Sequence, residues 1–161
     1  MGGALALYHA SFLPAAGVVG LSTPCQIRSD PRLKFLPYLS WLFPYIEKGD
    51  SDWQDPHARE DHFSYDKYPT KGVLQLISLT KILQAALPRV TIPALLIHSK
   101  KDLGVPPMNL DLIYNALGTP ENLKEKILLE NSGHVITRDS DKDIVFSSVQ
   151  SFINLTLNSL K

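Results

Sequence analysis

Two side chains that together can move a proton follow successive apolar segments in the second half of the chain. Asp102 lies in IHSKKDLGVPP, just after the apolar run at 94–98. His134 lies in ENSGHVITRD after the run at 126–130, where Gly133 is expected to let the backbone turn and present the imidazole. An imidazole can shuttle a proton to and from a hydroxyl, and a buried carboxylate can fix its tautomer and stabilise the imidazolium. The pair therefore predicts the acid and base that activate a hydroxyl nucleophile.

Alternating strands and helices are predicted around these two side chains. Apolar runs predict buried strands at 16–23, closed by Pro24, and at 94–98 and 126–130. Helices are predicted at about 2–11, 107–117 and 140–157; in the last, Ser140 is the expected N-cap and the expected buried side consists of Ile144, Val145, Val149, Phe152 and Ile153. This alternation implies a parallel α/β sheet, in which catalytic groups sit beyond the carboxyl ends of the strands.

A segment of different texture separates the first strand from the second. From Cys25 to about Ala86 the chain carries scattered aromatics, several prolines and an acidic stretch at 47–61. The apolar stretch at 33–46 is broken by two prolines, which predicts short helices. The spacing of apolar residues in GVLQLISLTKILQAAL, at 72–87, predicts one continuous helix. We interpret this segment as an insert in the sheet domain.

Composition excludes several classes of function. Sixteen Lys and Arg balance sixteen Asp and Glu in 161 residues, so no net field favours nucleic acid or an anionic membrane as partner. No apolar run reaches the roughly 20 residues of a membrane span, and the N-terminus lacks the basic segment of a signal peptide. The single cysteine, Cys25, excludes an internal disulfide and favours a reducing, cytoplasmic setting.

The segments PALLIHSKKDLGVPP and ILLENSGHVITRD resemble the acid and histidine loops of α/β-hydrolases of the carboxylesterase and monoacylglycerol lipase type. VVGLSTP is similar to the strand that leads into the cap of that family. The resemblance implies an α/β fold, namely the C-terminal part of an α/β-hydrolase, with three parallel strands, flanking helices and an inserted helical cap. It divides the chain into a first core part at 1–24, the cap at 25–86 and a second core part at 87–161.

The family's nucleophile elbow, G-x-S-M-G-G, is present only in its last residues. The chain opens on Met1, Gly2 and Gly3, so the nucleophilic serine would be the residue immediately before Met1, and no G-x-S-x-G occurs elsewhere. In the family the backbone N–H after the serine forms half of the oxyanion hole, and Met1 matches that position. The resemblance thus implies the C-terminal part of a serine hydrolase, inactive on its own.

What the resemblance implies about activity is hydrolysis of carboxylic esters or monoglycerides, with Asp102 orienting His134 as general base. No metal or organic cofactor is required for it. Four insert aromatics suit an acyl-binding lid, although they equally suit a core of the cap itself: Phe35, Tyr38, Trp41 and Phe43.

Other interpretations stay open at this point. The chain is alternatively a non-catalytic binding or interaction module on an α/β-hydrolase remnant, or it serves another chemistry of the fold, such as peptide or haloacid cleavage. His57 and His62 lie near acidic residues without a known metal-ligand spacing, and His98 is expected to be a packed or hydrogen-bonded residue at a strand end. Without a neighbour on its other edge, the strand at 16–23 is expected to promote self-association.

Overall fold

A three-stranded parallel sheet in the order β1-β4-β5 forms the centre of the fold. The computed structural model describes residues 1–27, 35, 38, 40–49 and 51–159. Its strands are β1 (Val18–Leu21), β4 (Ala94–Ser99) and β5 (Lys124–Leu129). Val18 is paired with Ala94, and Ala94 with Lys124. The predicted parallel α/β sheet is therefore confirmed, with all three strands within two residues of their expected places.

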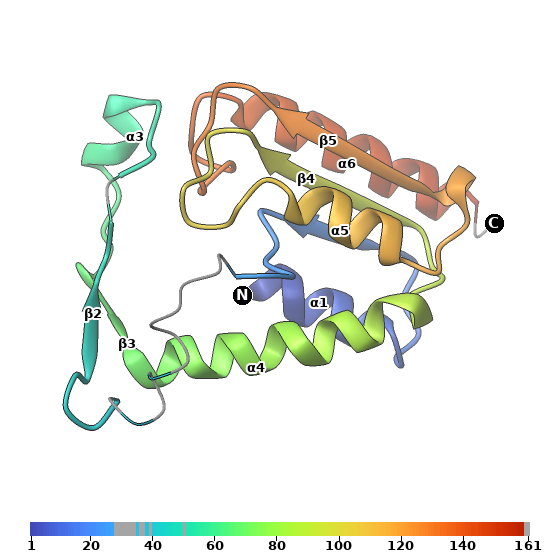
Figure 1. Cartoon of the computed structure of the whole chain (residues 1–161). Coiled ribbons are helices and arrows are strands. Elements are labelled where there is room, and N and C mark those ends of the chain that lie inside the picture. The colour runs from blue at the N-terminus through green and yellow to red at the C-terminus, as the bar shows by residue number, and fades with distance from the viewer. Residues whose placement is uncertain (28–34, 36–37, 39, 50, 160–161) are drawn as a thin grey trace.

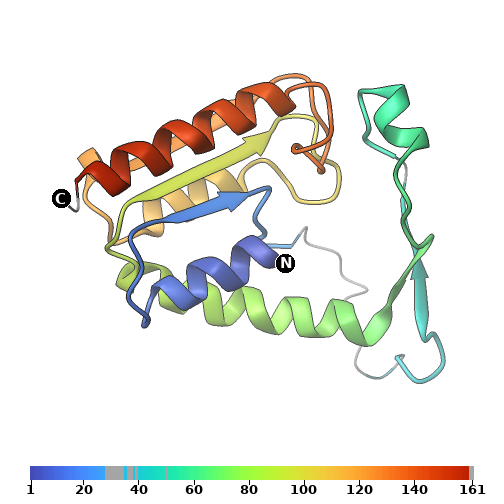
Figure 2. The same cartoon turned by 180° about the vertical axis from the view of Figure 1, so that it is seen from behind.

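Helices cover both faces of this sheet, because the central strand is apolar on both sides. All six residues of β4 are buried, and successive side chains of a strand point to opposite faces. Ala94 and Leu96 pack with helices α1 (Gly2–Ala10), α4 (Thr70–Ala86) and α5 (Asn109–Ala116). Leu95 and Ile97 pack on the other face, where α6 (Lys142–Asn158) lies across the sheet (Figures 1 and 2).

The start of α6 differs from the prediction. The helix begins at Lys142 with Asp141 at the N-cap position and no side-chain cap, so Ser140 is not the cap. Ser140 instead lies in the preceding loop, where its backbone N–H donates to Asp139 Oδ1 over 2.9 Å. Val145 is fully buried, but Ile144 and Ile153 are 50% and 42% exposed. The apolar pattern of this helix is broader than the stripe that the sheet covers.

The insert contains strands as well as helices. β2 (Tyr45–Glu47) and β3 (Lys67–Pro69) form a two-stranded antiparallel sheet, and α3 (Pro56–Glu60) lies between them in sequence. The predicted short helices are therefore wrong at Tyr45 and Ile46, because these residues pair with a strand some twenty positions later. Of the remaining stretch, residues 33–34, 36–37 and 39 lie outside the described residues. The predicted helix at 72–87 is confirmed as α4.

Short 3-10 turns complete the connections, η2 (Leu87–Arg89) after α4 and η3 (Glu121–Leu123) before β5. Together α3, β2 and β3 stand to one side of the sheet domain, near the end where its strands terminate (Figure 1). Within the described part of the chain, none of the helices has the length and apolar character needed to cross a bilayer.

Candidate active site

The two predicted catalytic side chains meet at the carboxyl edge of the sheet. Asp102 lies in the loop after β4, and His134 lies in the loop after the adjacent parallel strand β5. His134 Nδ1 is 2.9 Å from Asp102 Oδ2. Neighbouring parallel strands end at the same edge, which explains why side chains 32 positions apart come into contact.

Asp102 is a buried carboxylate with three hydrogen-bond donors. It is 3% exposed, and its Oδ1 accepts the backbone N–H of Val105 over 2.7 Å. Burial by itself would raise the pKa of Asp102, but the hydrogen bonds from His134 and His98 and the charge of His134 outweigh burial and hold that pKa well below its usual range. Asp102 is therefore ionised at neutral pH and able to stabilise an imidazolium.

The contact with Asp102 determines the tautomer of His134. A carboxylate only accepts hydrogen bonds, so Nδ1 carries the proton. In the neutral ring Nε2 is then a free base, and it has no hydrogen-bond partner among the described residues. The side chain of His134 is 40% exposed, so Nε2 is accessible to a reactant. This is the protonation state that a general base needs.

His98 is a second imidazole on the same carboxylate. It is 1% exposed, and its Nε2 lies 3.2 Å from Asp102 Oδ2 and 3.1 Å from the carbonyl oxygen of Val105. Both of these atoms are acceptors, so Nε2 of His98 carries a proton and donates. The sequence indicated a packed or hydrogen-bonded residue, which is confirmed. The sequence-based interpretation did not include the contact of His98 with Asp102. The spacing of four residues between them is the signal that could have suggested it.

Buried polar groups hold the histidine loop in place. Asp139 is fully buried and its carboxylate accepts four backbone N–H groups, those of Gly133, Gln54, Asp55 and Ser140. Burial would raise the pKa of Asp139, but these four bonds outweigh it and lower that pKa. Ser99 Oγ also donates to the carbonyl of Ser132. No motif or spacing in the sequence indicates this role for Asp139.

Known proteins share this arrangement of elements. A thermostable monoacylglycerol lipase of Bacillus sp. strain H-257 is 34% identical over 94% of this chain, and a carboxylesterase of Bacillus subtilis strain 168 is 25% identical over 95%. A solved structure from work on the metagenome-derived lipolytic enzymes LipS and LipT superposes with a TM-score of 0.85 at 34% identity, over 96% of this chain and 62% of the other. The chain has the fold of the α/β-hydrolases, and its sequence is similar to those of these lipolytic proteins.

The match to these relatives is partial in length. This chain spans 59% of the lipase and 60% of the carboxylesterase. A soluble variant of the monoglyceride lipase of Saccharomyces cerevisiae shares the fold at 15% identity, with a TM-score of 0.74 over 62% of its chain. No family model matches the sequence.

The other residues considered from the hydrolase resemblance lie in different places. Met1 is at the N-terminus of α1, at the end of the sheet where the strands terminate (Figure 1). The four insert aromatics are all exposed, by 57% to 88%, and so are not buried in a core: Phe35, Tyr38, Trp41 and Phe43. Cys25 is buried and unpaired by any disulfide.

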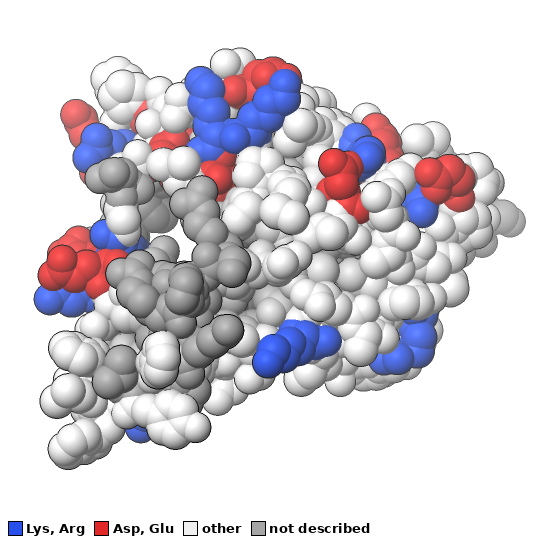
Figure 3. Space-filling view, in the orientation of Figure 1, with Lys and Arg blue, Asp and Glu red and all other residues white. Residues whose placement is uncertain are grey.

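Surface charge on this chain is mixed. His57 lies exposed on α3, and the ring of His62 is 4.9 Å from that of Trp53. Across the described ranges no three His, Cys, Asp or Glu side chains gather into a possible metal site. Basic and acidic side chains are interspersed on the face in Figure 3. Ion pairs such as that of Lys100 with Glu130 offset charge locally.

Proposed function

We propose that this chain supplies the acid and the general base of a serine hydrolase that cleaves carboxylic esters. The observation that carries the proposal is the 2.9 Å contact of His134 Nδ1 with Asp102, which leaves Nε2 basic and accessible. The 161 residues contain no G-x-S-x-G elbow. The nucleophilic serine accordingly comes from a segment outside them, and the chain alone is inactive.

The proposed reaction has two stages. The serine hydroxyl attacks the ester carbonyl while His134 Nε2 takes its proton, and the imidazolium then gives that proton to the departing alcohol. In the second stage His134 takes a proton from water as the water oxygen attacks the acyl-serine. The imidazolium then returns that proton to the serine oxygen as the carboxylic acid is released. Asp102 stays ionised throughout and stabilises the imidazolium. The backbone N–H of Met1, by its position at the start of α1, donates to the oxyanion.

The substrate class follows from the relatives and the insert. Two similar proteins are named as a monoacylglycerol lipase and a carboxylesterase, so we assign monoglycerides or simple carboxylic esters to this chain. We further propose that 25–86 acts as the cap and that its exposed aromatics, such as Tyr38 and Trp41, bind the acyl chain. The unpaired Cys25 fits a reducing cytoplasmic compartment.

A restored enzyme tests the proposal. A segment from a related lipase that ends on its elbow serine is fused to Met1, and hydrolysis of nitrophenyl butyrate and a monoglyceride is measured. We expect saturable turnover from the fusion and only background from the 161-residue chain. His134→Ala should reduce turnover to near the uncatalysed rate, whereas His57→Ala, on the exposed helix α3, should leave it unchanged. An active His134→Ala fusion would refute the assignment of the base.

The binding-module interpretation gives a different outcome in the same experiment. If the fusion folds and binds a monoglyceride but has no turnover, the chain is a non-catalytic module. Labelling by a fluorophosphonate distinguishes the cases, because it reports whether the supplied serine is activated.

A further inference from the structure

The insert makes a direct contact with both catalytic loops through one side chain. Asp52 lies shortly before helix α3, far from either loop in sequence. Its Oδ2 accepts the backbone N–H of His134 over 2.8 Å and the backbone N–H of Leu103 over 3.0 Å. A single carboxylate oxygen thus joins the general base to the residue that follows the acid.

We infer that Asp52 is a positioning residue, which fixes the acid loop and the histidine loop relative to each other and so sets the geometry of the Asp102–His134 pair. Hydrogen bonds from backbone N–H groups to a carboxylate are charge-assisted, and they are stronger than bonds between neutral groups. The anchored atoms belong to the backbones of residues 103 and 134. Leu103 directly follows Asp102, so displacement of either backbone would move Asp102 or His134. Such a movement would break the 2.9 Å contact between these two side chains.

Asp52 can fulfil this role because its own segment is held firmly. The backbone N–H groups of Gln54 and Asp55 donate to Asp139, the same buried carboxylate that accepts the N–H of Gly133. The side chain of Gln54 accepts a hydrogen bond from Lys101 over 3.0 Å. Segment 52–55 is therefore attached to both loops at several points.

Gly133 explains how the segment approaches so closely. Its φ is not positive, so a left-handed backbone conformation is not the reason for glycine there. A Cβ at Gly133 would instead collide with the backbone carbonyl of Asp52. Glycine at this position makes room for the insert against the histidine loop.

The inference rests on the proposed function for the catalytic roles of Asp102 and His134, but its test does not measure enzymatic activity. In the 161-residue chain, amide hydrogen exchange is measured at Leu103 and His134, and the protonated ring nitrogen of His134 is identified by ¹⁵N NMR. Asp52→Ala should speed exchange of both amides by roughly ten- to a hundredfold and reduce the Nδ1–H population of His134. Asp52→Asn, which keeps an acceptor oxygen, should restore much of both.

Asp55→Asn is the matched control, since it removes one charge in the same segment and keeps an oxygen for the cap of α3. It should change neither readout. Gly133→Ala should reproduce the effect of Asp52→Ala without removing any charge. Amides of β4 serve as an internal reference, because general unfolding would accelerate them as well.

The inference is overturned if Asp52→Ala leaves the ring tautomer of His134 and the exchange rates of both amides unchanged. Such a result would leave ester hydrolysis by the restored enzyme untouched, so the two proposals fail separately.

Discussion

The roles proposed for Asp102 and His134 depend on which ring nitrogen carries the proton. Asp102 Oδ2 faces imidazole nitrogens on both sides, Nδ1 of His134 and Nε2 of His98. Only an ionised carboxylate can accept from both rings, and this state leaves Nε2 of His134 as the base. In the proposed mechanism the buried acid therefore selects the tautomer of His134, in addition to stabilising the imidazolium.

Asp102→Asn should separate these effects in the restored enzyme. The amide can donate toward Nδ1 and hold the ring with its proton on Nε2, which is the wrong tautomer for a general base. We expect kcat to fall by about 10⁴-fold, the size of the corresponding loss in a serine protease. KM should change little. Stopped-assay kinetics over a range of pH checks this, and a loss below tenfold would contradict the tautomer argument.

Ser22, directly after β1, has an unfavourable backbone conformation and an unfavourably buried hydroxyl. It has a positive φ of 45°, and its buried Oγ finds no hydrogen-bond partner in the described part of the chain. Because burying an unpaired hydroxyl is unfavourable, Ser22→Ala should raise the free energy of unfolding by about 1 kcal/mol. Ser132→Ala is the control, since Ser132 Oγ accepts the N–H of Asp141 and its loss should destabilise. Urea unfolding of both variants measures the difference.

Local sequence was enough to propose Asp102 and His134 as acid and base, but it did not indicate the residues that hold them. Each of the two follows its own strand by a few residues, so short segments were sufficient to select them. Asp52 contacts His134 across 82 positions, and Asp139 contacts Gln54 across 85. Such contacts arise when the insert packs against the sheet domain. They join residues so far apart that the spacing of residues along a single sequence does not predict them.

At the scale of elements, the insert and the histidine loop are joined mainly by Asp139. Four backbone N–H groups from two distant segments end on this one buried carboxylate. Asp139→Ala should lower the free energy of unfolding by about 3 kcal/mol, since bonds to a charged acceptor contribute roughly 1.5–3 kcal/mol and the donors would be left buried. Exposed Asp66 provides the control variant, Asp66→Asn. Equal stability of the two variants would contradict the role of Asp139.

The same carboxylates predict the sensitivity of the chain to acid. The pKa values of Asp102 and Asp139 are both lowered in the folded state, so the folded chain binds fewer protons than the unfolded chain. The stability they contribute is fully present above the unfolded pKa of about 3.9 and is lost as pH falls below it toward the folded values. Urea midpoints at pH 7, 4 and 3 should decrease in this order, with a smaller decrease in Asp139→Asn.

Helices and strands were predictable from sequence where the apolar pattern of the element itself is clear and does not depend on a partner distant in sequence. Helix α4 and strand β4 have clear apolar spacing, and both were placed within about two residues. β2 was not, because Tyr45 and Ile46 become a strand only by pairing with Pro69 and Tyr68 of β3. Ile153 on α6 was expected to be buried and is exposed, since periodicity shows that a face is apolar without showing what covers it.

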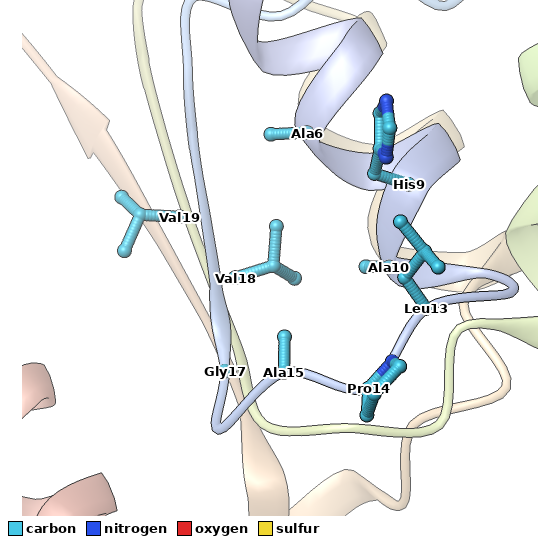
Figure 4. Close-up of a pocket in the computed structure, with 9 residues that line it drawn as sticks. All are labelled: Ala6, His9, Ala10, Leu13, Pro14, Ala15, Gly17, Val18 and Val19. Carbon is cyan, nitrogen blue, oxygen red and sulfur yellow. The ribbon is translucent and has the colours of Figure 1, made fainter.

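At the scale of the molecule, the sheet ends on an apolar edge. β1 pairs with β4 alone, which leaves its other edge unpaired within the described residues. Beside that edge, β1 and the end of α1 form a shallow pocket (Figure 4), lined by Ala6, His9, Ala10, Leu13, Pro14, Ala15, Gly17, Val18 and Val19. An open edge with apolar surroundings is a template for pairing with another chain.

We therefore expect the 161-residue chain to self-associate through β1 or to bind a hydrophobic dye. Burial of apolar surface contributes roughly 25 cal/mol per Å², so several hundred exposed Å² are worth about the net stability of a domain. Leu13, 48% exposed at the pocket, and Leu123, 42% exposed on η3, provide a matched pair. Leu13→Lys should reduce the associated fraction in size-exclusion chromatography with light scattering, because a charge at the edge opposes pairing, and Leu123→Lys should not. A monodisperse wild-type monomer with a sharp thermal transition would instead show that these residues fold as an independent domain, and would favour the binding module over the hydrolase part.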